Sequence, residues 1–387
     1  MSATTRTKAA GGPTSASATP GHFQPRLPLV KRMLCWLQAA IFTGLMGALK
    51  TLKPVVDKIF PQSFHPTLIK NYKSRPGLPI RVFFPKGYDH KNPQGNPLPC
   101  LFSIHGGGFV VGIPDLNDDW NHHFCNTHSA IVIALNYRKA PRHPFPTPIH
   151  DVTALITTVL DDHKDLARHI DPNRVAVAGF SAGGSLTLAV AQQPQIRSRI
   201  QAIVPVYPAC DFATPTDVKV RLRRYKEGLK GFRARKSDFL VYMMACFNWS
   251  YIPVGHDLTD PLLSGEVLPA SALPKRVFII AAEMDLLAHG AWRLACRLAG
   301  KPVPGYDQEV GRPELQPPHR LNLDDEAYHW LQKTKDGREV RWLLAPDAVH
   351  AFDMEAKLLA PFDKVMKADC RAKRDEEIEI IGKWLWG

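Results

Sequence analysis

Residues 175–184, Val-Ala-Val-Ala-Gly-Phe-Ser-Ala-Gly-Gly, decide the fold of this chain. A short apolar run breaks into a glycine-serine-glycine turn, and a helical pattern follows. In the order strand, sharp turn, helix, the pattern Gly-x-Ser-x-Gly carries a mechanism, because the turn lifts one hydroxyl above the edge of a sheet. Ser181 is therefore the candidate nucleophile, and Gly179 and Gly183 are the residues that let the turn close. The alternative is a glycine-rich turn that only packs a helix onto a sheet.

Apolar runs suited to buried strands alternate with helical patterns on both sides of this turn. Strands are predicted as a pair within 65–84 and at 100–104, 130–135, 175–178, 201–207, 276–282 and 340–344. Helical spacing covers 147–160 and a segment that ends near residue 300. Alternation of this kind predicts the α/β class, with a mostly parallel central sheet flanked by helices.

Three further groups of polar or glycine residues follow predicted strands. Asp285 comes after 276–282, His350 comes after 340–344, and the run from His105 through Gly106 to two more glycines comes after 100–104. The carboxyl ends of parallel strands converge on one crevice. Because a serine hydroxyl needs a base and a group that orients the base, these residues indicate nucleophilic catalysis.

Each of these residues also has a structural alternative. Asp285 can cap the following helix, and Glu283 and Asp347 are rival acids nearby. His350 is one of 16 histidines, distinguished by its place after the last predicted strand. We expect His105 to shape its loop by hydrogen bonding and not to act as a base. The four signals in order after four different strands favour a hydrolase.

Five segments together resemble the hormone-sensitive-lipase-like family of α/β-hydrolases, which includes arylacetamide deacetylases and many fungal and bacterial esterases. The segments are HGGGF (105–109), NYRKAPRHPFP (136–146), GFSAGG (179–184), DPLLS (260–264) and HAF (350–352). The resemblance covers about residues 98–360 and implies the α/β-hydrolase fold with a helical cap.

The resemblance also implies a role for each matching residue. Ser181 would attack an ester carbonyl, His350 would act as base and then acid, and Asp285 would fix the imidazole. The backbone N–H groups that would bind the oxyanion belong to Gly107, Gly108 and Ala182. No metal and no cofactor are implied.

The function that follows is hydrolysis of hydrophobic carboxylic esters through an acyl-enzyme, with a lipid or a secondary-metabolite ester among the candidate substrates. An acyltransferase, a lyase and a non-catalytic ligand-binding protein on the same fold are the alternatives.

This chain departs from the family pattern at three places. His289 stands where the family usually has a carboxylate, four residues beyond the acid, and Ala351 replaces a glycine. The segment 301–337 is longer than the usual link and rich in Pro, Asp and Gly. We expect it to be an irregular surface excursion or a lid.

The N-terminal region has two parts of different composition. Residues 1–27 are rich in small and polar residues and are predicted to be a disordered tail. Residues 28–60 are predicted to form a cap helix or a membrane-associated segment, because 33–49 carries no charge. A signal peptide, a membrane span and an amphipathic helix compete for this segment, and the amphipathic helix is favoured. Membrane association through 33–52 therefore stays open.

The remaining boundaries follow from the positions of the predicted strands. The core is expected to occupy 61–210 and 261–387, and the polar stretch 211–260, which interrupts the alternation of strands and helices, is expected to be a cap insertion. The resemblance implies a cap made from the N-terminal helices and this insertion, which would place the basic residues within 219–236 and the helix at 33–49 beside the substrate mouth.

The chain carries a formal charge of +13, so a nucleic-acid partner must be considered. Nine basic residues gather within 219–236, which we call the basic cluster, without any nucleic-acid-binding motif. No nucleic-acid partner is therefore predicted. A solvated helix face is favoured for the cluster over a patch that binds an anionic membrane or an acidic substrate.

Seven cysteines are scattered along the chain without the spacing of a disulfide framework or a zinc site. A reducing compartment fits this usage. We expect a cytoplasmic protein or one associated with a membrane through its N-terminal apolar segment. The sequence leaves the oligomeric state open.

Overall fold

The structure of the protein, a computed structural model, describes residues 22–59, 64–92, 95–354 and 362–387. Within these ranges a nine-stranded sheet has the order β1-β2-β4-β3-β5-β6-β7-β9-β8. Its strands are β1 (Leu68–Lys70), β2 (Ile80–Phe83), β3 (Leu98–Ile104), β4 (Ile131–Leu135), β5 (Ile170–Phe180), β6 (Ala202–Val206), β7 (Arg276–Ala282), β8 (His329–Lys333) and β9 (Glu339–Ala345).

The middle of the sheet, from β4 through β3, β5, β6 and β7 to β9, is parallel throughout. Antiparallel pairs occur only toward its two edges, where β1 and β2 join β4 and where β8 joins β9. The predicted α/β class with a mostly parallel sheet is confirmed.

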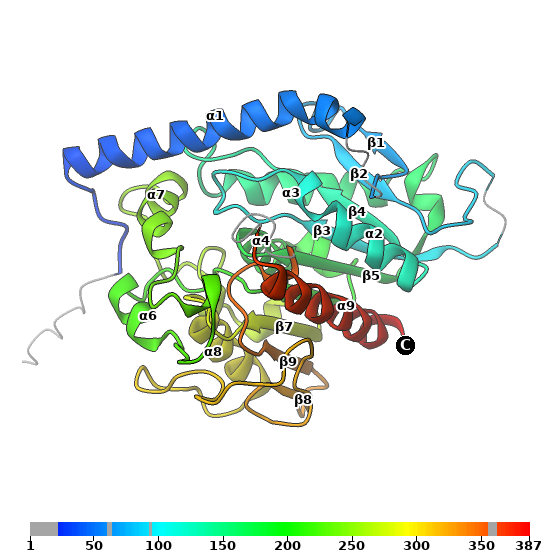
Figure 1. Cartoon of the computed structure of the whole chain (residues 1–387). Coiled ribbons are helices and arrows are strands. Elements are labelled where there is room, and N and C mark those ends of the chain that lie inside the picture. The colour runs from blue at the N-terminus through cyan, green and yellow to red at the C-terminus, as the bar shows by residue number, and fades with distance from the viewer. Residues whose placement is uncertain (1–21, 60–63, 93–94, 355–361) are drawn as a thin grey trace, which may run out of the picture.

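Helices cover both faces of the sheet (Figure 1). In the described residues they are α1 (Leu29–Ile59), α2 (Asp118–Thr127), α3 (Thr147–Leu160), α4 (Ala182–Ala191), α5 (Pro194–Arg197), α6 (Thr216–Leu222), α7 (Val241–Tyr251), α8 (Ala288–Ala299) and α9 (Lys364–Trp386). One apolar core lies between the sheet and α3, α4 and α8, and a second lies between the sheet and α2 and α9.

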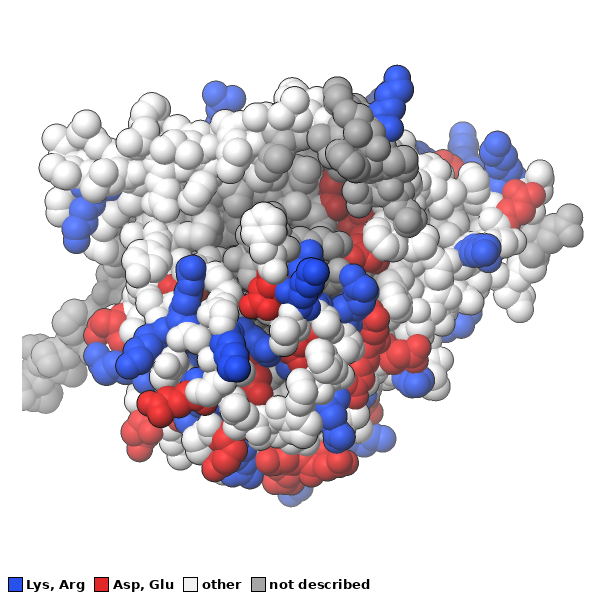
Figure 2. Space-filling model, viewed as in Figure 1, with Lys and Arg blue, Asp and Glu red and all other residues white. Residues whose placement is uncertain are grey.

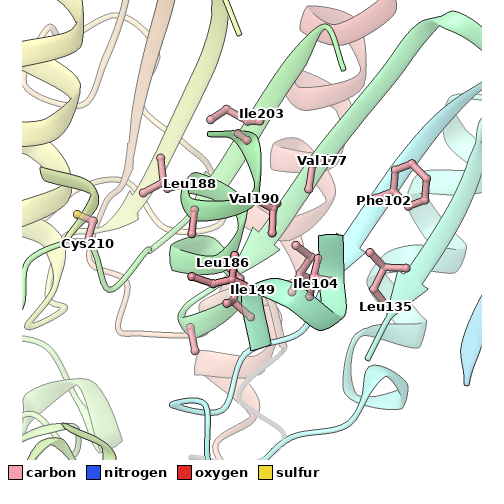
Figure 3. Close-up of a cluster of buried hydrophobic side chains, with 14 of the residues drawn as sticks. Phe102, Ile104, Leu135, Ile149, Val177, Leu186, Leu188, Val190, Ile203 and Cys210 are labelled. Carbon is pink, nitrogen blue, oxygen red and sulfur yellow. The ribbon is translucent and has the colours of Figure 1, made fainter. Parts of the chain in front are cut away.

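Strand β5 shows why one strand serves both cores. Val175 and Val177 belong to the core that contains α4, whereas Ala176 and Ala178 belong to the opposite core. Successive side chains of a strand point to opposite faces, and a strand buried on both faces is apolar at every position. Figure 3 shows the first core, where side chains of α4 pack against those of β3, β5 and β6. This packing fixes the start of α4 above the end of β5.

A helical cap lies above the carboxyl ends of the strands. Helix α1 runs along the top of Figure 1, and its first half packs on α7. Cys35 and Ala39 are the α1 residues buried in this contact, and the Cys246 thiol of α7 donates to the Cys35 carbonyl oxygen (3.4 Å). The N-terminal helix and the insertion 211–260 therefore contact each other through α1 and α7.

The N-terminal tail and the long link near the C-terminus differ in part from expectation. Residues 1–21 of the predicted tail lie outside the described residues, whereas Phe23 pairs with Asp257 in a β-bridge. Within 301–337, expected to be an irregular surface excursion or a lid, residues 329–333 form the edge strand β8. Only Trp330 of β8 is buried, so this strand lacks the apolar run that marked the others.

The prediction of a solvated helix face for the basic cluster is wrong. Helix α6 ends at Leu222, and the rest of the cluster is mostly loop. Lys226 is buried, and its Nζ lies 2.8 Å from Glu283 Oε2 and 2.6 Å from Asp347 Oδ1. The Arg223 side chain lies beside Asp238 with 5% of its surface exposed, and the Arg233 side chain lies beside Asp369 with 11% exposed. The acids that bind Lys226 and Arg233 lie 57 to 136 positions away in sequence, so the charge pattern of the segment did not reveal them.

Candidate active site

The turn between β5 and α4 places Ser181 at the edge of the sheet. Ser181 has φ 56° and ψ −118°, a strained conformation for a residue with a side chain. Its N–H donates to the Val206 carbonyl oxygen (2.9 Å), which holds the turn onto β6. A Cβ at Gly183 would lie 2.1 Å from the Ile104 carbonyl oxygen, and one at Gly179 would lie 2.2 Å from that of Gly183. The close approach of backbones therefore requires both glycines.

Three side chains from different strand ends meet at this turn. His350 Nε2 lies 2.8 Å from Ser181 Oγ, and His350 Nδ1 lies 2.7 Å from Asp285 Oδ2. Asp285 follows β7 and His350 follows β9. The structure thus brings together the three residues named as nucleophile, base and acid, although 65 and 169 positions separate the two bonded pairs in sequence.

The rival acids occupy a different place. Glu283 Oε2 and Asp347 Oδ1 both bind Lys226, and Glu283 Oε2 also accepts the Asp347 N–H (2.8 Å). These two carboxylates form a buried ion cluster beside the chain of three residues. Asp285 is the carboxylate on the imidazole.

The surroundings of His350 favour its protonated form. Burial lowers the pKa of the imidazole, but the charge of Asp285 and the hydrogen bond to it outweigh burial, with smaller contributions from Asp238 and Asp353. The net result is a pKa above the ordinary histidine value. An imidazole stabilised in this way can accept the proton of Ser181 and hold it.

The glycine loop after β3 lies against Ser181. Gly106, Gly107 and Gly108 line the same cavity as the hydroxyl. In the described part of the chain, the N–H groups of Gly107 and Gly108 donate to no protein acceptor. Ala182 is the first residue of α4, where a backbone N–H has no partner within the helix. These three amides are available to a negative charge beside Ser181.

The His105 side chain makes contacts within and beside this loop. Its Nδ1 lies 2.7 Å from the Gly106 carbonyl oxygen, and its Nε2 lies 3.2 Å from Lys139 Nζ. Its ring stacks on Tyr137 with centroids 4.5 Å apart. Burial, followed by the Lys139 charge, holds the pKa of His105 well below the ordinary value. The ring is therefore neutral at neutral pH. The imidazole that contacts Ser181 Oγ is that of His350, not that of His105.

A cavity of about 210 Å³ opens onto Ser181 and His350. Its apolar walls come from the cap and from the loops beneath it. Lining residues from the cap and these loops are Met46 of α1, Phe239 and Leu240 just before α7, Met243 and Phe247 of α7, and Val111, Leu116 and Met354. None of the described lining residues is Lys or Arg, so the basic cluster does not line this cavity.

Sequence reasoning missed Tyr207 as a neighbour of the base. Its ring meets the His350 imidazole edge-on with centroids 4.8 Å apart, and its hydroxyl donates to Asp353 Oδ1 (2.5 Å). Tyr207 directly follows β6, so the rule that polar groups after strands converge would have found it. Residues 301–337, considered as a lid, contribute none of the described residues that line the cavity.

The departures from the family pattern have local explanations. His289 Nε2 donates to the Gly305 carbonyl oxygen (3.0 Å) and ties the long segment 301–337 to α8. Ala351 has φ 59°, in the left-handed region that glycine prefers. Both positions remain compatible with the contact between His350 and Asp285.

The sequence is similar to those of known α/β-hydrolases. A protein-family model described as the α/β hydrolase fold matches residues 101–309. Arylacetamide deacetylase from Bos taurus is 28% identical over 246 residues, which are 59% of this chain and 56% of that protein. Carboxylesterase NlhH from Mycobacterium tuberculosis is 35% identical over 121 residues, which are 31% of this chain and 35% of that protein. The match spans about half the length of the bovine relative.

Solved structures share the architecture. An esterase from Pyrobaculum calidifontis superposes with a TM-score of 0.60 at 21% identity, covering 93% of this chain and 98% of that chain. At this identity the likeness concerns the fold.

Proposed function

The chain belongs to the α/β-hydrolase fold family, in its hormone-sensitive-lipase-like branch, and from that premise we propose that it is a serine hydrolase of carboxylic esters. The observation that carries this proposal is the hydrogen-bonded chain from Ser181 Oγ through His350 to Asp285. A serine becomes a useful nucleophile when a base and an orienting acid are in place.

The proposed reaction has two halves. Ser181 Oγ attacks the ester carbonyl carbon while His350 Nε2 takes the hydroxyl proton. The tetrahedral intermediate collapses, and the alcohol leaves with the proton from His350. Water then attacks the acyl-enzyme with His350 again as base, and the carboxylic acid leaves while Ser181 regains its proton. Asp285 keeps the imidazole oriented and stabilises its charged form.

The oxyanion of each tetrahedral intermediate would lie among the N–H groups of Gly107, Gly108 and Ala182. Amides fixed by a turn and by a helix start need no rearrangement when the negative charge develops. Removal of one such donor typically lowers kcat by about 10²- to 10³-fold.

The walls of the cavity support a hydrophobic ester as the substrate. Met46, Met243 and Phe247 surround the reacting hydroxyl with apolar surface, and no charged side chain other than the reacting groups lines the cavity in the described residues. Apolar walls with a few convergent polar groups are typical of sites for small apolar ligands. A lipid or a secondary-metabolite ester fits these requirements.

Substitution of the nucleophile tests the proposal. Ser181→Ala should lower turnover of a short-chain aryl ester by several orders of magnitude, because the three residues act as a unit. Ser198→Ala, at an exposed serine near α5, is the matched control and should keep wild-type turnover. Near-native activity of Ser181→Ala would remove the hydroxyl from its role. An alcohol acceptor added to the assay, followed by product analysis, separates hydrolysis from acyl transfer.

We further propose that α1 rests on an anionic membrane surface. By length and composition residues 29–48 could cross a membrane, with Lys31 and Arg32 near the start of the segment, and 11% of the apolar window is buried. Figure 2 shows the band over α1 as mostly uncharged with a few basic side chains. The outward apolar side chains of α1, each more than half exposed, are Leu29, Val30, Met33, Leu34, Trp36, Leu37, Ile41, Leu45 and Leu52.

An interfacial helix buries such a stripe in the headgroup region while the cap stays in place. Flotation with vesicles that contain anionic lipid should recover the wild-type protein, and Leu34→Glu with Leu37→Glu should abolish recovery. Leu315→Glu, at an exposed apolar residue outside α1, should float like wild type. Equal flotation of all variants would refute the surface contact, and resistance of cellular protein to alkaline extraction would indicate a membrane span instead.

A further inference from the structure

Asp238 joins the cap insertion to the turn that carries Asp285. Its carboxylate is buried at the start of the segment that leads into α7. Oδ1 accepts the Leu240 N–H (2.9 Å), and Oδ2 accepts the Leu286 N–H (2.9 Å). Leu286 directly follows Asp285 in the chain. One side chain therefore links two segments that lie 48 positions apart.

Hydrogen bonds within the turn after β7 also fix its conformation. The Leu287 N–H donates to Asp285 Oδ1 (3.0 Å), and the Ala288 N–H donates to the Asp285 carbonyl oxygen (3.1 Å). Asp238 takes the remaining N–H of the turn, that of Leu286. The direction in which Asp285 presents Oδ2 to His350 thus depends on an acceptor supplied by the cap.

Asp238 also brings charge close to the reacting residues. Arg223 Nε lies 3.4 Å from Asp238 Oδ2, and both side chains are buried. Burial and the charge of Asp285 raise the pKa of Asp238, whereas the Leu240 N–H, Arg223 and His350 lower it. The carboxyls that raise the pKa of the imidazole are Asp285, Asp238 and Asp353. Asp238 is the one of these three that belongs to the cap.

We propose that Asp238 is a positioning residue, through which the cap orients Asp285 and adds negative charge beside the His350 imidazole during ester hydrolysis. This inference rests on the proposed function. It explains why the cap contributes a buried ion pair with Arg223 at this point and not another apolar contact. A cap that is displaced would release the Leu286 N–H and lower the efficiency of the base.

The first test replaces the charge and keeps the shape. Asp238→Asn retains one carbonyl acceptor but removes the negative charge. We expect kcat to fall by about 10- to 100-fold, the effect of losing a charge-assisted hydrogen bond to a buried group. KM should stay near the wild-type value, because Asp238 itself does not line the cavity. The acidic limb of kcat/KM should move to lower pH, because a negative charge that stabilises the imidazolium is lost.

A conservative variant and a matched control separate positioning from folding. Asp238→Glu keeps the charge and should restore the limb toward its wild-type position. Asp211→Asn removes a similarly buried carboxylate at the base of the same segment, where Oδ1 accepts the N–H groups of Ala213 and Thr214. This control should leave the limb where it is, even if the protein melts at a lower temperature.

The titration of His350 can also be followed without any substrate. Proton NMR of the Nδ1–H shared with Asp285, assigned by its absence in His350→Ala, should show a lower imidazole pKa in Asp238→Asn than in wild type. An unmoved pKa together with wild-type kcat would overturn the inference, as would equal shifts in Asp238→Asn and Asp211→Asn. If the wild-type protein cleaves no ester at all, the proposed function fails, whereas the NMR result still reports the link between Asp238 and His350.

Discussion

Gly108 is the position where a single methyl group tests the glycine loop most sharply. Its φ of +57° lies in the left-handed region, and a Cβ there would be 2.3 Å from Cδ2 of Phe247 on α7. Gly108→Ala must therefore move the loop, the ring or both. Because the Gly108 N–H is one of the proposed oxyanion donors, displacement of the loop acts directly on the transition state.

Two costs can be worked from this geometry. An alanine in the left-handed region costs about 1–2 kcal/mol, and a methyl forced into a packed site costs about 1–3 kcal/mol. These costs lower the free energy of unfolding. Loss of one oxyanion donor lowers kcat by about 10²- to 10³-fold, whereas binding of the uncharged ground state changes little.

The assay measures kcat and KM for a short-chain aryl ester beside urea unfolding of each variant. Gly255→Ala is the matched control, because Gly255 has φ +78° and open space around its Cβ position. It should show the backbone cost in unfolding with wild-type kcat. Gly108→Ala combined with Phe247→Ala should lose less stability than the sum of the two single variants, because the added methyl enters the space that the ring leaves. If Gly108→Ala is destabilised as expected but keeps kcat within about threefold of wild type, the loop amides are not oxyanion donors.

Three further outcomes follow from buried charges. The kcat/KM of the wild-type enzyme should fall as pH decreases through the pKa of His350, because the base must be neutral. This pKa lies above the ordinary histidine value of 6.5, because the charge of Asp285 outweighs the effect of burial. A profile that is flat down to about pH 4 contradicts the role of His350 as the base. Lys226→Met should lower the free energy of unfolding by about 3–5 kcal/mol in chemical denaturation, because two buried carboxylates lose their cation. Lys230→Met, at an exposed residue of the basic cluster, should change the free energy of unfolding by less than about 0.5 kcal/mol. Equal effects of the two substitutions would refute the buried ion cluster around Lys226. Burial, followed by the charge of Asp353, raises the pKa of Glu377 well above its ordinary value, so the protonated carboxyl stabilises the fold at low pH and this stability is lost as pH rises through the raised pKa. Glu377→Gln should therefore increase the melting temperature more at pH 8 than at pH 5. An increase of equal size at both pH values would contradict the raised pKa.

The parts of the site that the sequence predicted are those fixed by chain order along parallel strands. Ser181, Asp285 and His350 each follow a strand, and convergence of strand ends brought them within hydrogen-bond distance. The apolar strand runs were equally informative, because central strands are buried on both faces.

The parts that the sequence did not predict depend on pairing between distant segments. The bond from Leu286 to Asp238 and the ion cluster around Lys226 join residues 48 to 121 positions apart, and no local pattern marks their partners. Edge strand β8 was missed because only one of its side chains is buried. Tyr207 was missed although it obeys the same strand-end rule as the residues that were found.

The proposed reaction requires that Ser181 is a nucleophile activated by His350. Treatment with an alkyl fluorophosphonate, followed by digestion and mass spectrometry, measures this directly. We expect one adduct, on the peptide that contains Ser181. It should be absent from Ser181→Ala and form at least about 100-fold more slowly in His350→Ala. An adduct on another residue, or labelling of His350→Ala at the wild-type rate, would contradict it.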